Sequence, residues 1–113
     1  MVDDGVFRNP ALAVDAISLR GDPGVVEVLM IRRGAEPWKG SLAFPGGFVD
    51  LGEDPEEAVL RELLEETGVS GREPQLFAVR GAPDRDPRKH IVSIFYLVEV
   101  DVDSVPEAGD DAS

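Results

Sequence analysis

The sequence predicts an α+β domain with a mixed β-sheet. Two observations predict this class: one well-marked helix lies in the middle of the chain, and strand-like segments stand on both sides of it. With 113 residues, 42% of them hydrophobic, the chain is large enough for one hydrophobic core. We therefore expect a single domain over residues 1–113, with the acidic tail, 101–113, as a loop or a disordered terminus.

The N-terminal part is predicted to form a β-hairpin and a loop. Residues 12–19 alternate in part between apolar and polar, and the turn signal GDPG, 21–24, leads to a second strand over 25–33. In the segment GAEPWKGSLAFPGG, 34–47, glycines and prolines exclude a long helix. They leave room for a short strand at 42–44.

The segment EDPEEAVLRELLEETG, 53–68, is predicted to contain the helix together with the residues that mark its two ends. Asp54 suits the N-cap, Pro55 suits the first helical position, Glu57 completes a capping box, and Gly68 suits the position after the helix. Both ends of this element are therefore marked by the sequence itself.

Two further strands are predicted after the helix. Residues 75–80 form a short strand candidate, and the segment GAPDRDPRKH, 81–90, is typical of a loop. The run IVSIFYLVEV, 91–100, is continuously apolar, which indicates a buried central strand.

Charge and composition exclude several classes of function. The formal net charge of −12 disfavours binding to nucleic acids and to anionic membranes, and a phosphorylated ligand would need a cation or clustered arginines. The absence of cysteine and the single histidine exclude disulfides and zinc sites built from these residues. Neither a signal peptide nor an apolar stretch of roughly 20 residues is present, so we expect a cytoplasmic protein.

Three glutamates crowd one side of the predicted helix. At about 100° per residue, Glu62, Glu65 and Glu66 share a face, and Ala58 falls beside them, leaving room for a ligand to approach. The apolar residues expected on the opposite, core-facing side are Val59, Leu60, Leu63 and Leu64.

This crowding has two interpretations. Carboxylates about 4 Å apart repel each other by about 1 kcal/mol in water, and a divalent cation would reverse that sign because Mg²⁺ prefers oxygen ligands. A solvated acidic face is the alternative, since many surface helices are rich in glutamate. The upstream run FPGGFVDLGED favours the cation, because Gly46 and Gly47 let backbone carbonyls approach a ligand and Glu53 directly precedes the helix.

From Gly47 the chain runs GFVDLGEDPEEAVLRELLEETGV. This run resembles the signature of the Nudix hydrolases, GX5EX7REUXEEXGU with U aliphatic, at every specified position. The lead-in WKGSLAFPGGFVDLGED and the later APDRDPRKHIVSIFYLVEV are similar to the ADP-ribose pyrophosphatase branch, so the resemblance covers about residues 12–112.

The resemblance implies an α/β/α sandwich with a mixed sheet, and hydrolysis of a nucleoside diphosphate derivative with Mg²⁺ or Mn²⁺. ADP-ribose, cleaved to AMP and ribose 5-phosphate, is the first candidate substrate. Glu53 and Arg61 would orient the metal site, and Glu62 or an acid from another loop would accept a proton. The metal ligands implied by the resemblance are the carbonyl of Gly46 and the carboxylates of Glu62, Glu65 and Glu66.

Three residues outside the signature are candidates for binding the substrate. Arg85 and Arg88 can contact a phosphate or a ribose, and the alternative is that they neutralise Asp84 and Asp86 in an exposed loop. Trp38 can stack on adenine or cap the edge of the sheet.

Relatives that this chain resembles continue past an AGDDA-like stretch into another strand and a closing helix, which this sequence lacks. A shortened chain or a homodimer that supplies the missing cover would explain the difference, and the frequent dimers of such pyrophosphatases favour the homodimer. Glu107, Asp110 and Asp111 lie where the family often keeps an additional acid.

Other functions remain open at this point. Nudix-like domains of transcriptional regulators bind ADP-ribose without cleaving it, although they usually have a degraded signature and a fused DNA-binding segment. NADH, dinucleoside polyphosphates and oxidised nucleotides are alternative substrates of the same signature. A purely structural acidic domain would leave the Gly-Gly lead-in unexplained.

Overall fold

The computed structural model describes residues 8–22 and 24–107. In this part of the chain one helix interrupts a series of short strands. The elements in order are β1 (Ala11–Ile17), β2 (Leu19–Asp22), β3 (Val25–Val28), β4 (Ile31–Arg32), β5 (Leu42–Ala43), β6 (Gly46–Phe48), α1 (Pro55–Thr67), β7 (Arg72–Arg80) and β8 (Ile91–Glu99).

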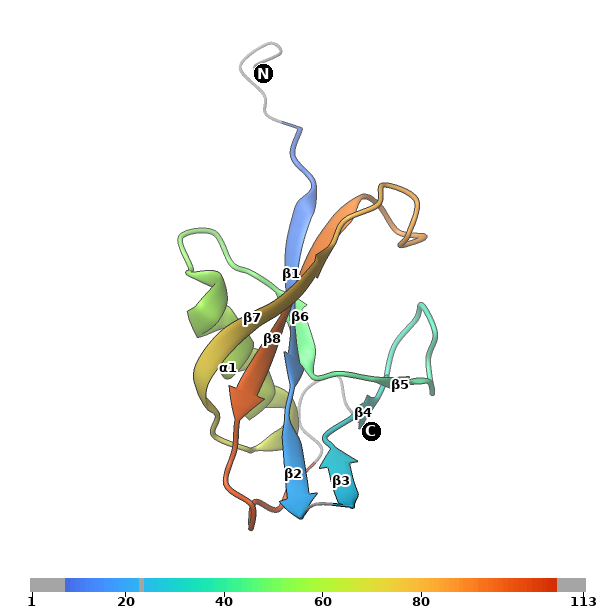
Figure 1. Cartoon of the computed structure of the whole chain (residues 1–113). Coiled ribbons are helices and arrows are strands. Elements are labelled where there is room, and N and C mark those ends of the chain that lie inside the picture. Colours follow the sequence, from blue (N-terminus) through green and yellow to red (C-terminus); the bar gives the residue numbers. More distant parts are fainter. Residues whose placement is uncertain (1–7, 23, 108–113) are drawn as a thin grey trace.

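The largest sheet has four strands in the order β6-β1-β8-β7, and helix α1 covers one side of it (Figure 1). Strands β1 and β8 are parallel, whereas β1 with β6 and β7 with β8 are antiparallel. The predicted α+β class and mixed sheet are therefore confirmed. The apolar run that ends the strand series is central, as predicted, because β8 lies between β1 and β7.

The predicted hairpin is present as β2 and β3, but the predicted strands 12–19 and 25–33 are each divided. The first strand divides because the chain changes partner: Ile17 pairs with Leu97 of β8, and Leu19 already pairs with Val28 of β3. The second divides between β3 and β4, where β4 leaves the hairpin and pairs with β5.

Two other strands differ in extent from the prediction. The strand expected at 75–80 begins earlier, at Arg72, because pairing with β8 already starts opposite Glu99. The Gly-Gly lead-in, expected as a close-approach loop, is itself a strand, β6, paired antiparallel with β1.

Helix α1 has the ends that the sequence predicted. The Asp54 carboxylate accepts a hydrogen bond from the backbone N–H of Glu56 at 2.8 Å, so the cap bonds to the second helical residue rather than to Glu57. At the other end Gly68 has a left-handed φ of 73° and donates its N–H to the carbonyl of Leu64 at 2.8 Å. A residue without Cβ adopts this conformation at little cost.

The predicted faces of α1 were partly wrong. Leu64, expected in the core, is 49% exposed, whereas Ala58, expected on the open acidic side, is fully buried. The buried side is rotated toward the acidic residues and includes Glu66, which is only 5% exposed. A carboxylate is tolerated there because it accepts the backbone N–H of Gly46.

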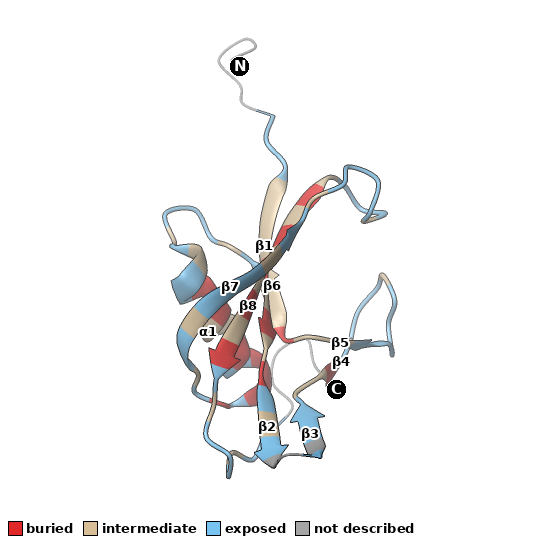
Figure 2. Cartoon of the chain, viewed as in Figure 1, coloured by how far each residue is buried: buried red, intermediate tan, exposed pale blue. Residues whose placement is uncertain are grey.

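The core lies between α1 and one face of the sheet (Figure 2). Val14 of β1 and Tyr96 and Val98 of β8 face the helix, and alternate residues of both strands face the opposite side. The buried residues that form this core are Val14, Ala16, Ala58, Val59, Leu63, Tyr96 and Val98.

Gly71, directly before β7, fits tightly against this core. A Cβ atom at this position would contact the side chains of Val98 and Leu63. We expect Gly71→Ala to lower the free energy of unfolding by roughly 1–3 kcal/mol, the usual cost of overpacking. Urea unfolding measures it, with Ser70→Ala, an exposed neighbour, as the control. Equal stability of the two variants would contradict the packing of Gly71.

The first part of the predicted tail, residues 101–107, has neither helix nor strand, but it is anchored. The N–H of Glu107 donates to the carbonyl of Thr67 at 2.7 Å, and Arg20 donates to the carbonyl of Ser104 at 2.6 Å. The candidate acids Asp110 and Asp111 lie outside the described residues. Over residues 8–22 and 24–107, no helix has the length and apolar character needed to span a membrane.

Candidate functional site

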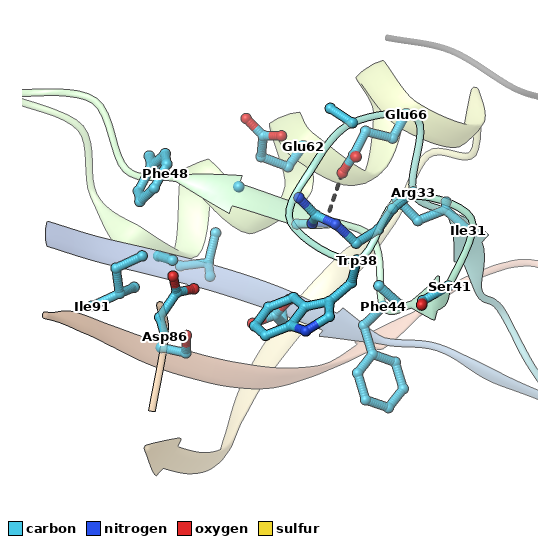
Figure 3. A pocket seen from close by; sticks show the side chains of 18 of the residues that line it. Ile31, Arg33, Trp38, Ser41, Phe44, Phe48, Glu62, Glu66, Asp86 and Ile91 are labelled. Atoms are coloured by element: carbon cyan, nitrogen blue, oxygen red, sulfur yellow. Dashed lines mark hydrogen bonds between the residues drawn. The ribbon is translucent and has the colours of Figure 1, made fainter. Parts of the chain in front are cut away.

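A cavity of about 700 Å³ lies on the face of the sheet opposite the core and reaches around the β6 edge to α1 (Figure 3). Its floor is formed by the alternate residues of β1 and β8 that point away from the helix, including Asp15, Ser93 and Phe95. The predicted site residues that line the cavity are Trp38, Gly46, Glu62, Glu66, Arg85 and Arg88.

The acidic end of the cavity is built on the outward edge of β6. Pro45 and Val49 hydrogen-bond to β1, so the backbone groups of Gly46, between them, point away from β1. The N–H of Gly46 donates to Oε1 of Glu66 at 2.6 Å, which joins the helix to the strand (Figure 3). The carbonyl of Gly46 also lies on this outward edge.

Glu62 occupies the space that a side chain at position 47 would fill. A Cβ atom on Gly47 would lie 2.5 Å from Oε2 and 2.6 Å from Cδ of Glu62. Glycine is therefore required here so that the carboxylate can rest against the backbone of β6. Burial raises the pKa of Glu62 above its ordinary value, and the neighbouring Arg61 opposes this shift.

Arg61 connects the acidic residues beside the cavity. Its guanidinium donates to both carboxylate oxygens of Glu53, at 2.7 and 2.9 Å, to Glu62 at 2.7 Å and to Glu65 at 3.1 Å. It also donates to the carbonyl of Phe48 at 3.2 Å. The hydrogen bonds from Arg61 lower the pKa of Glu53 from 4.5 to about 2. Neither Arg61 nor Glu53 lines the cavity itself.

Glu65 is placed differently from the other two glutamates of the predicted cluster. Its side chain is 45% exposed, it pairs with Arg61, and it does not line the cavity. Among residues 8–22 and 24–107, no group of three or more His, Cys, Asp or Glu side chains is arranged to hold a metal ion. The structure thus brings together Glu62, Glu66 and Gly46, and leaves Glu65 to one side.

The two loop arginines have different partners. Arg85 donates to Oγ of Ser93 on the cavity floor at 2.7 Å, whereas Arg88 forms a two-point pair with Asp86 at 3.0 and 2.9 Å. The pair with Arg88 lowers the pKa of Asp86 to about 2. The neutralising role considered for these arginines therefore applies to Arg88, which also lies 5.5 Å from the centroid of the Phe48 ring.

Trp38 is presented to the cavity by a tightly bonded loop between β4 and β5 (Figure 3). Arg33 donates to the carbonyl of Pro37 at 2.7 Å, and the N–H of Ser41 donates to the carbonyl of Trp38 at 3.0 Å. Trp38 has a left-handed φ of 61° and is 52% exposed. These hydrogen bonds fix the backbone of the loop that brings Trp38 to the cavity, where its side chain stays about half exposed.

Sequence reasoning missed several cavity residues. Asp15 is the most informative: burial raises its pKa from 3.8 to about 6, against the lowering effect of Arg85 and Arg33. Its signal in the sequence was a single charged residue inside the otherwise apolar strand ALAVDAI. The other missed cavity residues include Arg33, Phe44, Ser93 and Phe95.

A mixed sheet, a glutamate-bearing helix hydrogen-bonded to a Gly-Gly strand, and a cavity lined by both carboxylates and arginines define a small α+β domain with a polar site. The chain belongs to the Nudix family, because the profile of the NUDIX domain matches residues 9–113.

Known proteins agree with this assignment. A protein named ADP-ribose pyrophosphatase from Methanocaldococcus jannaschii is 44% identical over 107 residues, which are 95% of this chain and 60% of that relative. The NUDIX domain of Shewanella oneidensis NrtR, solved with ADP ribose, superposes with a TM-score of 0.86 at 28% identity, covering 99% of this chain and 74% of that one.

A third similar protein is a bifunctional NMN adenylyltransferase/ADP ribose pyrophosphatase from Francisella tularensis, solved with AMP and a manganese ion. Its TM-score is 0.75 at 32% identity, and the match covers 95% of this chain and 33% of that one. This chain thus spans between about one third and three quarters of the length of these three proteins.

Proposed function

We propose that this chain is a metal-dependent Nudix pyrophosphohydrolase of nucleoside diphosphate derivatives, with ADP-ribose as its substrate and AMP and ribose 5-phosphate as products. The observation that carries the proposal is the arrangement at one end of the cavity, where Glu62 and Glu66 line the cavity beside the outward-facing backbone of Gly46. The resemblance to proteins named for ADP-ribose pyrophosphatase activity supports the choice of substrate.

The donor set at this end fits Mg²⁺ or Mn²⁺. Glu62 and Glu66 supply carboxylate oxygens and Gly46 supplies a carbonyl, and hard divalent cations prefer such ligands. Glu65 would join them by turning its exposed side chain away from Arg61. When bound, the cation would offset the charge of the diphosphate and make the attacking water more acidic.

In the proposed reaction a water oxygen forms a bond to one phosphorus, and the bond from that phosphorus to the bridging oxygen breaks. Glu62 accepts the proton of the water, and the bridging oxygen leaves with the other phosphate. Glu53 acts through Arg61, which holds Glu62 by a hydrogen bond of 2.7 Å. Arg85, fixed by Ser93 on the cavity floor, is placed to contact a phosphate.

A substitution at Gly47 tests the position of the Glu62 carboxylate without removing a charged group. We expect Gly47→Ala to fold normally, because the atoms its Cβ would meet belong to the end of the flexible Glu62 side chain. The displaced carboxylate should lower kcat by about tenfold or more, since a shift of 1 Å at a reacting group can cost about 100-fold. Far-UV circular dichroism and Mg²⁺-dependent hydrolysis of ADP-ribose measure the two effects. Unchanged turnover would remove Glu62 from the reaction.

A ligand sensor is the second candidate, favoured by the similarity to the NUDIX domain of NrtR, which was solved with ADP ribose. The two functions differ in turnover. The deciding experiment incubates the chain with ADP-ribose, NADH, diadenosine polyphosphates and 8-oxo-dGTP in Mg²⁺, in Mn²⁺ and in EDTA, and separates the products. Metal-dependent AMP and ribose 5-phosphate support the hydrolase, whereas binding of ADP-ribose without cleavage supports the sensor.

Homodimer formation and a cytoplasmic location, both expected from the sequence, remain predictions. Light scattering after gel filtration tests the dimer directly.

A further inference from the structure

Asp15 is a carboxylate of the cavity that the proposed reaction does not use. It lies in β1, opposite Gly46 of β6 and opposite Phe95 of β8, on the cavity face of the sheet. The residue is half-buried, and within the described ranges its carboxylate takes part in no hydrogen bond or ion pair. Arg33 and Arg85 act on it only through the electrostatic field. Its acceptor oxygens are thus available to a ligand.

The surroundings of Asp15 are aromatic on one side. Phe95 is its direct neighbour in the sheet and packs edge-to-face with Phe44, with ring centroids 6.3 Å apart. Trp38 lines the same cavity from the loop before β5 (Figure 3). Proteins usually bind a nucleobase by packing its flat ring against aromatic side chains and placing a hydrogen-bonding group at the edge of the ring. The surroundings of Asp15 offer both.

We propose that Asp15 is a specificity-determining residue, whose carboxylate accepts a hydrogen bond from the exocyclic amine of a nucleobase packed beside Phe95 and Trp38. The proposal deepens the proposed function, on which it rests for the position of the diphosphate at the Glu62 end. An ionised carboxylate can only accept hydrogen bonds, so it favours the 6-amino group of adenine. The 6-oxo group of hypoxanthine would place two acceptor oxygens against each other.

The test compares AMP, whose base carries a 6-amino group, with IMP, whose base carries a 6-oxo group. Neither nucleotide contains a diphosphate that the protein could cleave. Affinities are measured with Mg²⁺ by calorimetry and by the fluorescence of Trp38, the only tryptophan in the sequence. We expect the wild type to bind AMP at least about tenfold more tightly than IMP, because a buried acceptor facing an acceptor is left unpaired. In Asp15→Asn the ratio should fall to about threefold or less, since an amide both accepts and donates.

The control is Asp84→Asn, which removes the charge of an exposed loop carboxylate outside the cavity and should keep the wild-type ratio. Equal affinities in the wild type, binding of neither nucleotide, or an unchanged ratio in Asp15→Asn would overturn the proposal. Equal weakening of AMP and IMP in Asp15→Asn would also overturn it, because Asp15 would then bind the shared ribose. Preference for AMP without any hydrolysis of ADP-ribose would refute the proposed hydrolase alone.

Discussion

Replacing Glu66 by glutamine is expected to lower Mg²⁺-dependent hydrolysis of ADP-ribose by roughly 10³-fold or more while leaving the fold intact. The loss follows because a neutral amide is a poor ligand for a hard cation, and the cation contributes several kcal/mol to the transition state. The fold should survive because the amide oxygen of glutamine can still accept the N–H of Gly46, now 2.6 Å from Oε1 of Glu66.

Steady-state kinetics and thermal unfolding of the same preparations measure the two parts of this prediction. The matched control is Glu57→Gln, which removes one negative charge from an exposed position of the same helix, away from the cavity. Near-normal turnover in Glu66→Gln would remove this residue from the metal site. Loss of the folded state would instead show that the charge itself holds α1 to β6.

Replacing Arg61 by methionine is expected to lower both activity and stability. The guanidinium holds Glu53, Glu62 and Glu65 in place, so its removal should reduce turnover by about 10- to 100-fold, as for other residues that orient metal ligands. The melting temperature should fall as well, because three neighbouring carboxylates would lose their shared cation.

The stability that Arg61→Met loses depends on pH in a direction that follows from the pKa of Glu53. Arg61 holds the pKa of Glu53 at about 2, below its ordinary value of 4.5, so the pair stabilises the fold above about pH 4.5. The stability difference between wild type and Arg61→Met should therefore be complete near pH 7 and should shrink as the pH falls toward 2. Thermal unfolding across this range measures it.

A second variant tests the stability prediction from the opposite side. Adding Glu62→Gln to Arg61→Met should recover part of the lost stability by removing one repelling charge, without recovering activity. A double variant that is less stable than Arg61→Met would show that Glu62 has another partner and that repulsion is not the cause.

The sequence predicted best what depends on local chemistry. The ends of α1 are fixed by the cap at Asp54 and by the left-handed Gly68, which short-range rules describe. These ends depend on residues close together in the chain. The grouping of Glu62 and Glu66 with Gly46, which lies 20 residues before Glu66, came instead from the resemblance to the Nudix signature.

The faces of the helix and the floor of the cavity depend on tertiary packing. Hydropathy alone placed Leu64 in the core and Glu66 outside, because it could not show that a backbone N–H of β6 would accommodate a buried carboxylate. Likewise Asp15 and Phe95 become neighbours only through the pairing of β1 with β8, which are 80 residues apart at this point (95 minus 15). A pattern within one strand contains no such information.

The hydrogen bonds that join α1 to β6 also bear on self-association of the protein. An outer strand of a sheet carries unpaired backbone groups, which can recruit a strand from another chain and start aggregation. In β6 the outward N–H of Gly46 is bonded to Glu66 and the outward carbonyl of Phe48 to Arg61. Glu66, which lines the acidic end of the cavity, and Arg61, which holds Glu62 there, therefore also protect this border against unwanted strand addition.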